Sequence, residues 1–275
     1  MAVVLILLLF LVEGLAADLS AGQEPEVIGE SVEGREIRSY ALGTGDTDII
    51  LIGGIHGGYE WNTVQLARMM LEHFAENGGQ IPDNYRLHII PNMNPDGLHR
   101  ITEGADIDTT DFSSLNTTPG RFNARGVDLN RNWDAQWKPT SYWGQTEVDA
   151  GSEPFSEPET RAARDFILER DPAVVIFFQS AANGIWFGGK REGNEPARRL
   201  AAAYAEASGY DLPDGSDGPV NYEITGAASS YLYRQGIRAL TIELETHSQP
   251  EFDRNISGVR AVFERLDEQE QEQNN

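Results

Sequence analysis

Cysteine is absent from the 275 residues of this chain. Its absence excludes disulfide bonds, thiolate metal sites and cysteine nucleophiles. Any bound metal must therefore be held by His, Asp or Glu side chains. Internal repeats are lacking as well. A chain of this length with 40% hydrophobic residues is long enough to bury the core of one large α/β domain or two small ones.

Positive charge is also scarce, and nearly all of it is arginine, because Lys138 and Lys190 are the only lysines. Forty-four Asp and Glu residues give a formal net charge of −23 and a pI near 4.5. Such a charge repels nucleic acid phosphates and anionic lipids, so we expect no nucleic acid partner. The acidic excess fits a halophilic protein and, equally well, ordinary solubility charge.

The N-terminus begins with a short apolar run over residues 1–12, followed by small residues up to position 17. This pattern predicts a secretory signal peptide at 1–17 and a secreted or extracytoplasmic protein without a stable membrane span after cleavage. No Lys or Arg precedes the apolar run. A short membrane anchor or a buried first strand therefore stays open as an alternative.

Apolar and β-branched runs alternate with amphipathic segments along the rest of the chain. We expect strands at 35–42, 48–53, 86–91, 173–178 and 239–244, and helices at 61–74, 156–170, 195–208, 227–235 and 251–268. The alternation predicts an α/β fold, a three-layer αβα sandwich with a mixed, mostly parallel central sheet. We expect a single domain over 18–268 and a disordered polar tail over 269–275.

Two local features accompany this prediction. Ser156 to Glu159 has the pattern of a capping box at the start of a helix. Residues 92–133 are rich in Asn, Asp, Gly and Thr, which predicts a long loop, and loops of that length are usually functional or disordered.

A histidine and a glutamate follow the strand predicted at 48–53, in the segment Gly-Ile-His56-Gly-Gly-Tyr-Glu60. Parallel sheets carry their sites at the carboxyl ends of strands. An imidazole and a carboxylate in that place are suitable zinc ligands. The alternative is a glutamate that caps the following helix beside a surface histidine.

The end of the predicted loop carries three arginines, Arg121, Arg125 and Arg131, within eleven residues. A planar guanidinium binds a carboxylate through two parallel hydrogen bonds. The neighbouring pair Asn130 and Arg131 therefore suits the terminal carboxylate of a substrate. The alternative is an arginine buried in a structural ion pair.

These segments, together with Thr-Ile-Glu243-Leu near the C-terminus, resemble the zinc carboxypeptidases, the metallopeptidase family typified by carboxypeptidase A. The resemblance extends over residues 48–244, and its most specific part is Gly-Val-Asp-Leu-Asn130-Arg131-Asn-Trp. It implies the αβα fold of that family. It also implies one Zn²⁺ ion as cofactor and a peptide or acyl-amino-acid substrate with a free carboxylate.

The resemblance assigns roles residue by residue. His56 and Glu60 match two zinc ligands, and Gln179 stands where the third ligand, a histidine, is expected. The other matches are Asn130 and Arg131 for the substrate carboxylate, Arg121 for the oxyanion, Glu243 for the general base, Tyr222 for the tyrosine that closes over the substrate, and Ser229 for the position that sets side-chain preference. A small hydroxyl at Ser229 argues against a dedicated acidic or basic pocket.

Two departures from the family pattern bear on the metal. Three residues rather than two separate His56 from Glu60. The neutral amide of Gln179 is a weak partner for zinc, so we predict a weakened or empty zinc site. His247, four residues beyond Glu243, is the best-placed histidine to act as a substitute.

The sequence supports three hypotheses on function. The first is a secreted, zinc-dependent metallocarboxypeptidase that hydrolyses the C-terminal amide bond of peptides and is weakened by Gln179. The second is a non-catalytic relative that binds carboxylate-terminated peptides. The third is an amidase that acts on cell-wall peptides or acyl-amino acids.

Overall fold

A seven-stranded mixed sheet forms the centre of the protein, with strand order β1-β2-β4-β3-β7-β9-β8. The computed structural model describes residues 24–189, 194–213 and 222–273, so the signal peptide predicted at 1–17 lies outside the described part. The strands are β1 (Glu26–Glu30), β2 (Glu36–Leu42), β3 (Thr47–Ile52), β4 (Tyr85–Ile90), β7 (Val174–Ser180), β8 (Gly184–Phe187) and β9 (Ala239–Leu244).

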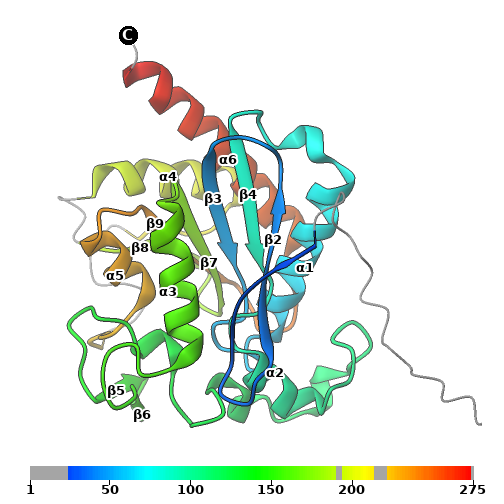
Figure 1. Ribbon diagram of the computed structural model, residues 1–275, viewed down its shortest axis with the longest axis vertical. Helices are drawn as coiled ribbons and strands as arrows, with labels where there is room; N and C mark the ends of the chain where they lie inside the picture. Colours follow the sequence, from blue (N-terminus) through cyan, green and yellow to red (C-terminus); the bar gives the residue numbers. More distant parts are fainter. Residues whose placement is uncertain (1–23, 190–193, 214–221, 274–275) are drawn as a thin grey trace, which may run out of the picture.

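The middle of the sheet is parallel. Strands β4, β3, β7 and β9 pair in parallel, and the strands outside them, β2 with β1 on one side and β8 on the other, are antiparallel. Residues 174–178 are fully buried along β7, as expected for a strand covered on both faces. The carboxyl ends of β3 and β4 point toward the end of the molecule where α2 (Pro95–Thr102) and the small hairpin of β5 (Thr140–Trp143) and β6 (Thr146–Asp149) lie (Figure 1).

Helices cover both faces of this sheet and make the three layers that the sequence predicts. They are α1 (Trp61–Glu76), α2 (Pro95–Thr102), α3 (Pro158–Arg170), α4 (Glu195–Ser208), α5 (Ala228–Arg234) and α6 (Phe252–Gln273). Strand β3 shows why both faces are apolar: Ile49 and Leu51 pack with α1, α4 and α6, whereas Ile50 and Ile52 pack with α3 and α5. Successive strand residues point to opposite faces, so an unbroken apolar run serves both cores.

The segment predicted as a long loop, residues 92–133, holds more structure than we expected. It contains α2 and three short 3₁₀ turns, at Phe112–Ser114, Thr118–Arg121 and Leu129–Arg131. Asn94 caps α2, because its side chain accepts a hydrogen bond from the backbone N–H of Gly97. The many Asn, Asp and Gly residues of this segment therefore build turns and caps rather than a structureless connection.

The capping box predicted at Ser156 is wrong. Helix α3 has Glu157 as its N-cap residue, without a side-chain capping bond. The Ser156 hydroxyl donates instead to the Glu157 carboxylate and accepts from Asn132. Pro158 fixes the first helical turn in place of a cap.

The described chain also differs from the prediction near its C-terminus. Helix α6 continues to Gln273, so residues 269–273, expected in the disordered tail, are helical. Glu and Gln are good helix formers, which accounts for the extension. Across residues 24–189, 194–213 and 222–273, no helix combines the length and hydropathy needed to cross a membrane.

Candidate active site

The first two predicted metal ligands lie side by side after β3. His56 and Glu60 are only 2% and 1% exposed. The glutamate precedes α1 and makes no side-chain capping bond. The alternative of a capping glutamate beside a surface histidine therefore does not describe this structure.

Both nitrogens of the His56 ring face carboxylate oxygens. Nδ1 lies 2.7 Å from Oε1 of Glu60, and Nε2 lies 3.2 Å from Oδ1 of Asp128. Burial and Arg121 lower the pKa of His56, but the two carboxylates raise it by more, so its pKa is raised overall. Two acceptors suit the doubly protonated imidazolium, whereas a metal needs the neutral ring.

Arg121 forms a buried ion pair with Asp128. Its Nε and Nη2 donate to Oδ2 of Asp128 over 3.0 and 2.8 Å, and Nη1 lies 3.6 Å from Oε1 of Glu60. Burial raises the pKa of Asp128, but Arg121 and His56 outweigh that effect and hold it well below its usual range. Arg121 is therefore the arginine that forms a buried structural ion pair, the alternative considered for this group of arginines. It also lies beside the predicted ligand Glu60.

Asn130 connects three parts of the site. Its Nδ2 donates to Oε1 of Gln179 over 3.2 Å, and its Oδ1 accepts from the backbone N–H of Ala228 at the start of α5. Ser229, the predicted preference residue, is the next residue of that helix and is half-buried. The predicted carboxylate-binding amide therefore contacts both the predicted third-ligand position and the predicted specificity helix.

Arg131 is held by backbone carbonyls. Its Nη1 donates to the Asn130 carbonyl over 2.8 Å, and its Nε and Nη2 donate to the Tyr142 carbonyl over 3.2 and 3.0 Å. Tyr142 belongs to the hairpin of β5 (Thr140–Trp143) and β6 (Thr146–Asp149). Burial lowers the pKa of Arg131. The half-buried Tyr222 lies close enough to oppose part of that shift.

Glu243 follows Gln179 across the sheet, because the two residues are register partners in β9 and β7. Burial and the carboxylate of Glu60 raise the pKa of Glu243 to about 8. This shift favours the protonated form of the carboxyl. A nearby cation would favour its charged form.

His247, the proposed substitute ligand, lies at the edge of the site. Its Nδ1 is 2.9 Å from Oγ of Ser180, whose hydroxyl also bonds Oδ1 of Asn62. The Asn62 amide nitrogen donates to the carbonyls of Thr246 and Gln249, so its oxygen is the acceptor and Ser180 is the donor. The remaining Ser180–His247 bond then takes its proton from Nδ1, which fixes the tautomer of His247.

Comparisons with known proteins show the family of this chain. The family model described as zinc carboxypeptidase matches residues 11–263, so the chain belongs to the zinc carboxypeptidase family. It is 32% identical over 174 residues to carboxypeptidase B of Astacus astacus and 33% identical over 174 residues to a zinc carboxypeptidase of Simulium vittatum. Each match covers 60% of this chain and 56% of the relative, so the chain spans about half the length of these curated relatives.

Solved structures show the same fold at low identity. Bovine thrombin-activatable fibrinolysis inhibitor, solved with a tick carboxypeptidase inhibitor, superimposes with a TM-score of 0.73 and 19% identity, covering 90% of each chain. The murein-tripeptide amidase MpaA from Escherichia coli O157 gives a TM-score of 0.59 and 23% identity, covering 89% of this chain and 91% of that one.

The residues of this chain fit the zinc of that family only in part. His56 and Glu60 are suitable ligands, and the buried Oε2 of Glu60 has no hydrogen-bond partner. The third position does not fit, because Oε1 of Gln179 faces Asn130 and an amide is a weak zinc ligand. In the described residues, no three His, Asp or Glu side chains are arranged to hold a metal ion.

Two parts of the site were not predicted from the sequence. Asp128 binds both His56 and Arg121, and the signal was available, since Asp128 stands inside the most specific motif. The β5–β6 hairpin was not predicted. Its strands have four residues each, too few to show an alternating pattern.

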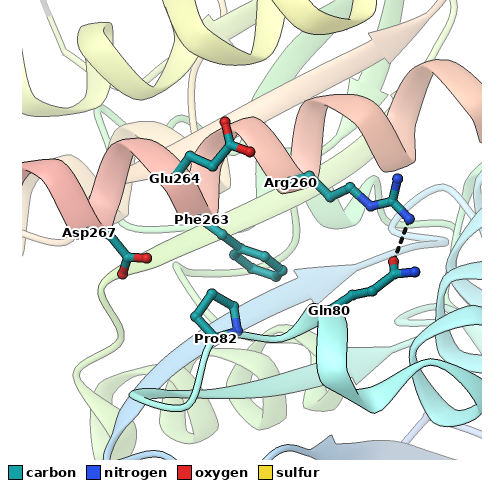
Figure 2. A pocket seen from close by; sticks show the side chains of 6 residues that line it. All are labelled: Gln80, Pro82, Arg260, Phe263, Glu264 and Asp267. Carbon is teal, nitrogen blue, oxygen red and sulfur yellow. Dashed lines mark hydrogen bonds between the residues drawn. The ribbon is translucent and has the colours of Figure 1, made fainter.

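A separate shallow pocket lies away from this site, between α6 and the segment after α1 (Figure 2). Arg260 donates there to the amide oxygen of Gln80. The lining residues are Gln80, Pro82, Arg260, Phe263, Glu264 and Asp267, none of which belongs to the predicted site. We assign this pocket no role.

Proposed function

We propose that this chain acts as a metallocarboxypeptidase on peptides or acyl-amino acids with a free C-terminal carboxylate, with zinc affinity weakened by Gln179. The observation that supports this proposal is the placement of Arg131 and Asn130 beside Arg121 and Glu243 at the carboxyl ends of the parallel strands. A carboxylate bound by the clamp of Asn130 and Arg131 brings the last amide bond of the substrate toward Arg121 and Glu243.

Each of these residues has its own role in the proposed hydrolysis. Arg131 and Asn130 orient the terminal carboxylate by charge-assisted hydrogen bonds. Arg121 stabilises the negative charge that develops on the scissile carbonyl oxygen. Glu243 moves a proton from water to the leaving amine. The Lewis acidity that activates the water is the contribution of a zinc ion, for which this chain offers two good ligands instead of three.

Binding of carboxylate-terminated peptides without hydrolysis is the second candidate. The hydrogen bond from Asn130 to Gln179 favours it, because this bond directs the Gln179 oxygen toward the clamp instead of a metal. An amidase on cell-wall peptides or acyl-amino acids would use the same clamp. The fold shared with the murein-tripeptide amidase is compatible with that substrate class.

Parallel binding and hydrolysis measurements separate these candidates. Peptides with free and amidated C-termini would be titrated into the protein in chelator, and hydrolysis would then be followed after zinc is added. We expect binding only of the free carboxylate, and slow hydrolysis with zinc that Glu243→Gln abolishes. Binding without hydrolysis at any zinc concentration, together with hydrolysis by Gln179→His, would favour the non-catalytic candidate. Equal binding of the amidated peptide would contradict the clamp.

Export of the protein is also a proposal, supported by the apolar run and small residues of the segment 1–17. Mass spectrometry of the mature N-terminus after expression in a secreting host tests it. Cleavage after position 17 is the expected result, and an intact Met1 would contradict it.

A further inference from the structure

Two asparagine–glycine pairs occur in this sequence, Asn77-Gly78 and Asn183-Gly184. The side-chain amide of an asparagine can be attacked by the backbone nitrogen of the next residue. Glycine leaves that nitrogen most accessible, because it has no Cβ and its backbone rotates freely. Both pairs therefore carry the same chemistry for cyclisation and loss of ammonia, and the fold determines which pair can use it.

The pair Asn77-Gly78 lies in the exposed turn between α1 and β4. Asn77, Gly78 and Gly79 are all exposed, and a Cβ built at either glycine would have no heavy atom within 4 Å. Asn77 is the C-cap of α1, and its amide nitrogen donates to the carbonyl of His73 over 2.8 Å. Its own backbone carbonyl accepts from the N–H of Gln80. Hydrogen bonds at an exposed helix end open at little free-energy cost.

The pair Asn183-Gly184 lies at the start of β8 and is held from several sides. The backbone N–H of Asn183 donates to the carbonyl of Leu244, and its carbonyl accepts from the N–H of Asp211. The side-chain oxygen of Asn183 accepts from Nη2 of Arg254 over 3.2 Å. Gly184 is buried. Rotation of Asn183 toward the nitrogen of Gly184 would break these bonds, so the native structure opposes cyclisation there.

We propose that Asn77 is a site of spontaneous deamidation in the native protein and that the fold protects Asn183. The nitrogen of Gly78 attacks Cγ of Asn77, a C–N bond forms and the Cγ–Nδ2 bond breaks. The proton of the attacking N–H leaves with Nδ2 as ammonia. Water then opens the cyclic imide at either of its carbonyl groups, which gives aspartate or isoaspartate at position 77. The reaction needs neither metal nor substrate, so it does not depend on the proposed function.

The modification changes the end of α1. An ionised carboxylate at position 77 has no proton to donate to the carbonyl of His73. It also adds a negative charge at the C-terminus of the helix, where the helix dipole disfavours it. Both effects loosen the last turn of α1, the helix that begins directly after Glu60.

Peptide mapping of the full chain by mass spectrometry tests the proposal. The folded protein is incubated at mildly alkaline pH and sampled over several days, with a parallel incubation in guanidinium chloride as the unfolded reference. In the folded protein we expect Asn77 to convert about tenfold faster than Asn183 or more, because opening the segment of Asn183 breaks several hydrogen bonds. In guanidinium chloride the two should convert at similar rates.

Two glycine variants of the same turn provide the matched comparison. Gly78→Ala places a methyl group next to the attacking nitrogen, whereas Gly79→Ala leaves the asparagine–glycine pair intact. Neither new Cβ has a heavy atom within 4 Å, so both variants should fold. Conversion at Asn77 should be largely lost in Gly78→Ala and should persist in Gly79→Ala.

Three results would overturn the proposal. If Asn77 stays intact in the folded protein, whether or not it converts in guanidinium chloride, it is not a deamidation site of the native chain. Equal rates at Asn77 and Asn183 in the folded protein would show that the fold does not select between them. Unchanged conversion in Gly78→Ala would contradict attack by the nitrogen of Gly78.

Discussion

The side-chain amide of Asn130 donates a hydrogen bond to the side-chain oxygen of Gln179, across 3.2 Å in the buried part of the site. Asn130 lies in the turn Leu129–Arg131, and Gln179 lies near the end of β7. The bond joins the residue expected to hold substrate to the residue expected to hold metal. Gln179 is thus hydrogen-bonded to a residue of the proposed carboxylate clamp.

The substitution Gln179→His should restore zinc binding. The imidazole adds a third good ligand to His56 and Glu60, the number that catalytic zinc sites use. After dialysis against trace zinc, elemental mass spectrometry should find about one zinc per chain in the variant and far less in the wild type. Gln179→Leu, which has neither amide nor imidazole, is the control and should also lack zinc.

Stoichiometric zinc in the dialysed wild type would contradict this prediction. His247 would then be the first residue to examine. Loss of that zinc in His247→Ala would identify it as the missing ligand, and an unchanged zinc content would exclude it.

Asp128→Asn should destabilise the protein strongly. The carboxylate of Asp128 is fully buried between Arg121 and His56, and removing one partner of a buried ion pair costs about 3–5 kcal/mol. Urea unfolding at constant salt measures the change. Glu223→Gln is the control, because its ion pair with Lys138 is exposed and such pairs contribute little. Equal unfolding midpoints for both variants would refute this assignment.

His88 should make the stability depend on pH. Burial lowers the pKa of this histidine and Asp48 only partly opposes that effect, so the unfolded chain takes up the proton first as the pH falls. The free energy of unfolding should therefore decrease below about pH 6.5, the ordinary histidine pKa. His88→Gln should reduce that decrease, and His99→Gln, at an exposed position of α2, serves as its control. A pH profile identical to that of the wild type in His88→Gln would count against this interpretation.

Gly226→Ala should disturb both stability and the clamp. Gly226 has a φ of +66°, and a Cβ there would lie 1.9 Å from the backbone oxygen of Arg131. Gly34 has a φ of +76° with no heavy atom within 4 Å of such a Cβ, so Gly34→Ala incurs only the backbone strain. Thermal unfolding should show the larger loss for Gly226→Ala, together with weaker binding of free-carboxylate peptides. Similar losses in the two variants would show that the contact with Arg131 is relaxed easily.

The sequence predicted the parallel centre of the sheet because its strands are continuous apolar runs. Val174 to Phe178 in β7 is an example, and the helices that flank it carry clear 3.6-residue periodicity. The two edge strands, β1 and β8, escaped prediction: Glu26–Glu30 reads Glu-Val-Ile-Gly-Glu and is largely exposed. Edge strands gain their order from pairing with a neighbour, and a local pattern does not contain that information.

The site was predictable where motifs are local and escaped prediction where it is assembled by tertiary contacts. His56 and Glu60 lie four positions apart, and Asn130 and Arg131 are adjacent, so the sequence places each pair together. The contact of Trp143 with Arg121 joins the β5–β6 hairpin to the turn Thr118–Arg121, and no spacing in the sequence indicates it. The position of Asp128 is set by charge pairing, because its carboxylate binds Arg121 and His56 at the same time.

The β5–β6 hairpin contacts Arg131 and Arg121 through two consecutive residues in two different ways. Tyr142 uses its backbone carbonyl on Arg131, which any residue type supplies, and Trp143 uses its ring on Arg121, which only certain residue types supply. A substitution at position 143 therefore changes the surroundings of Arg121, whereas a substitution at position 142 keeps the backbone bond to Arg131. The hairpin thus makes one contact through a side chain, which mutation can change, and one through the backbone, which mutation leaves in place.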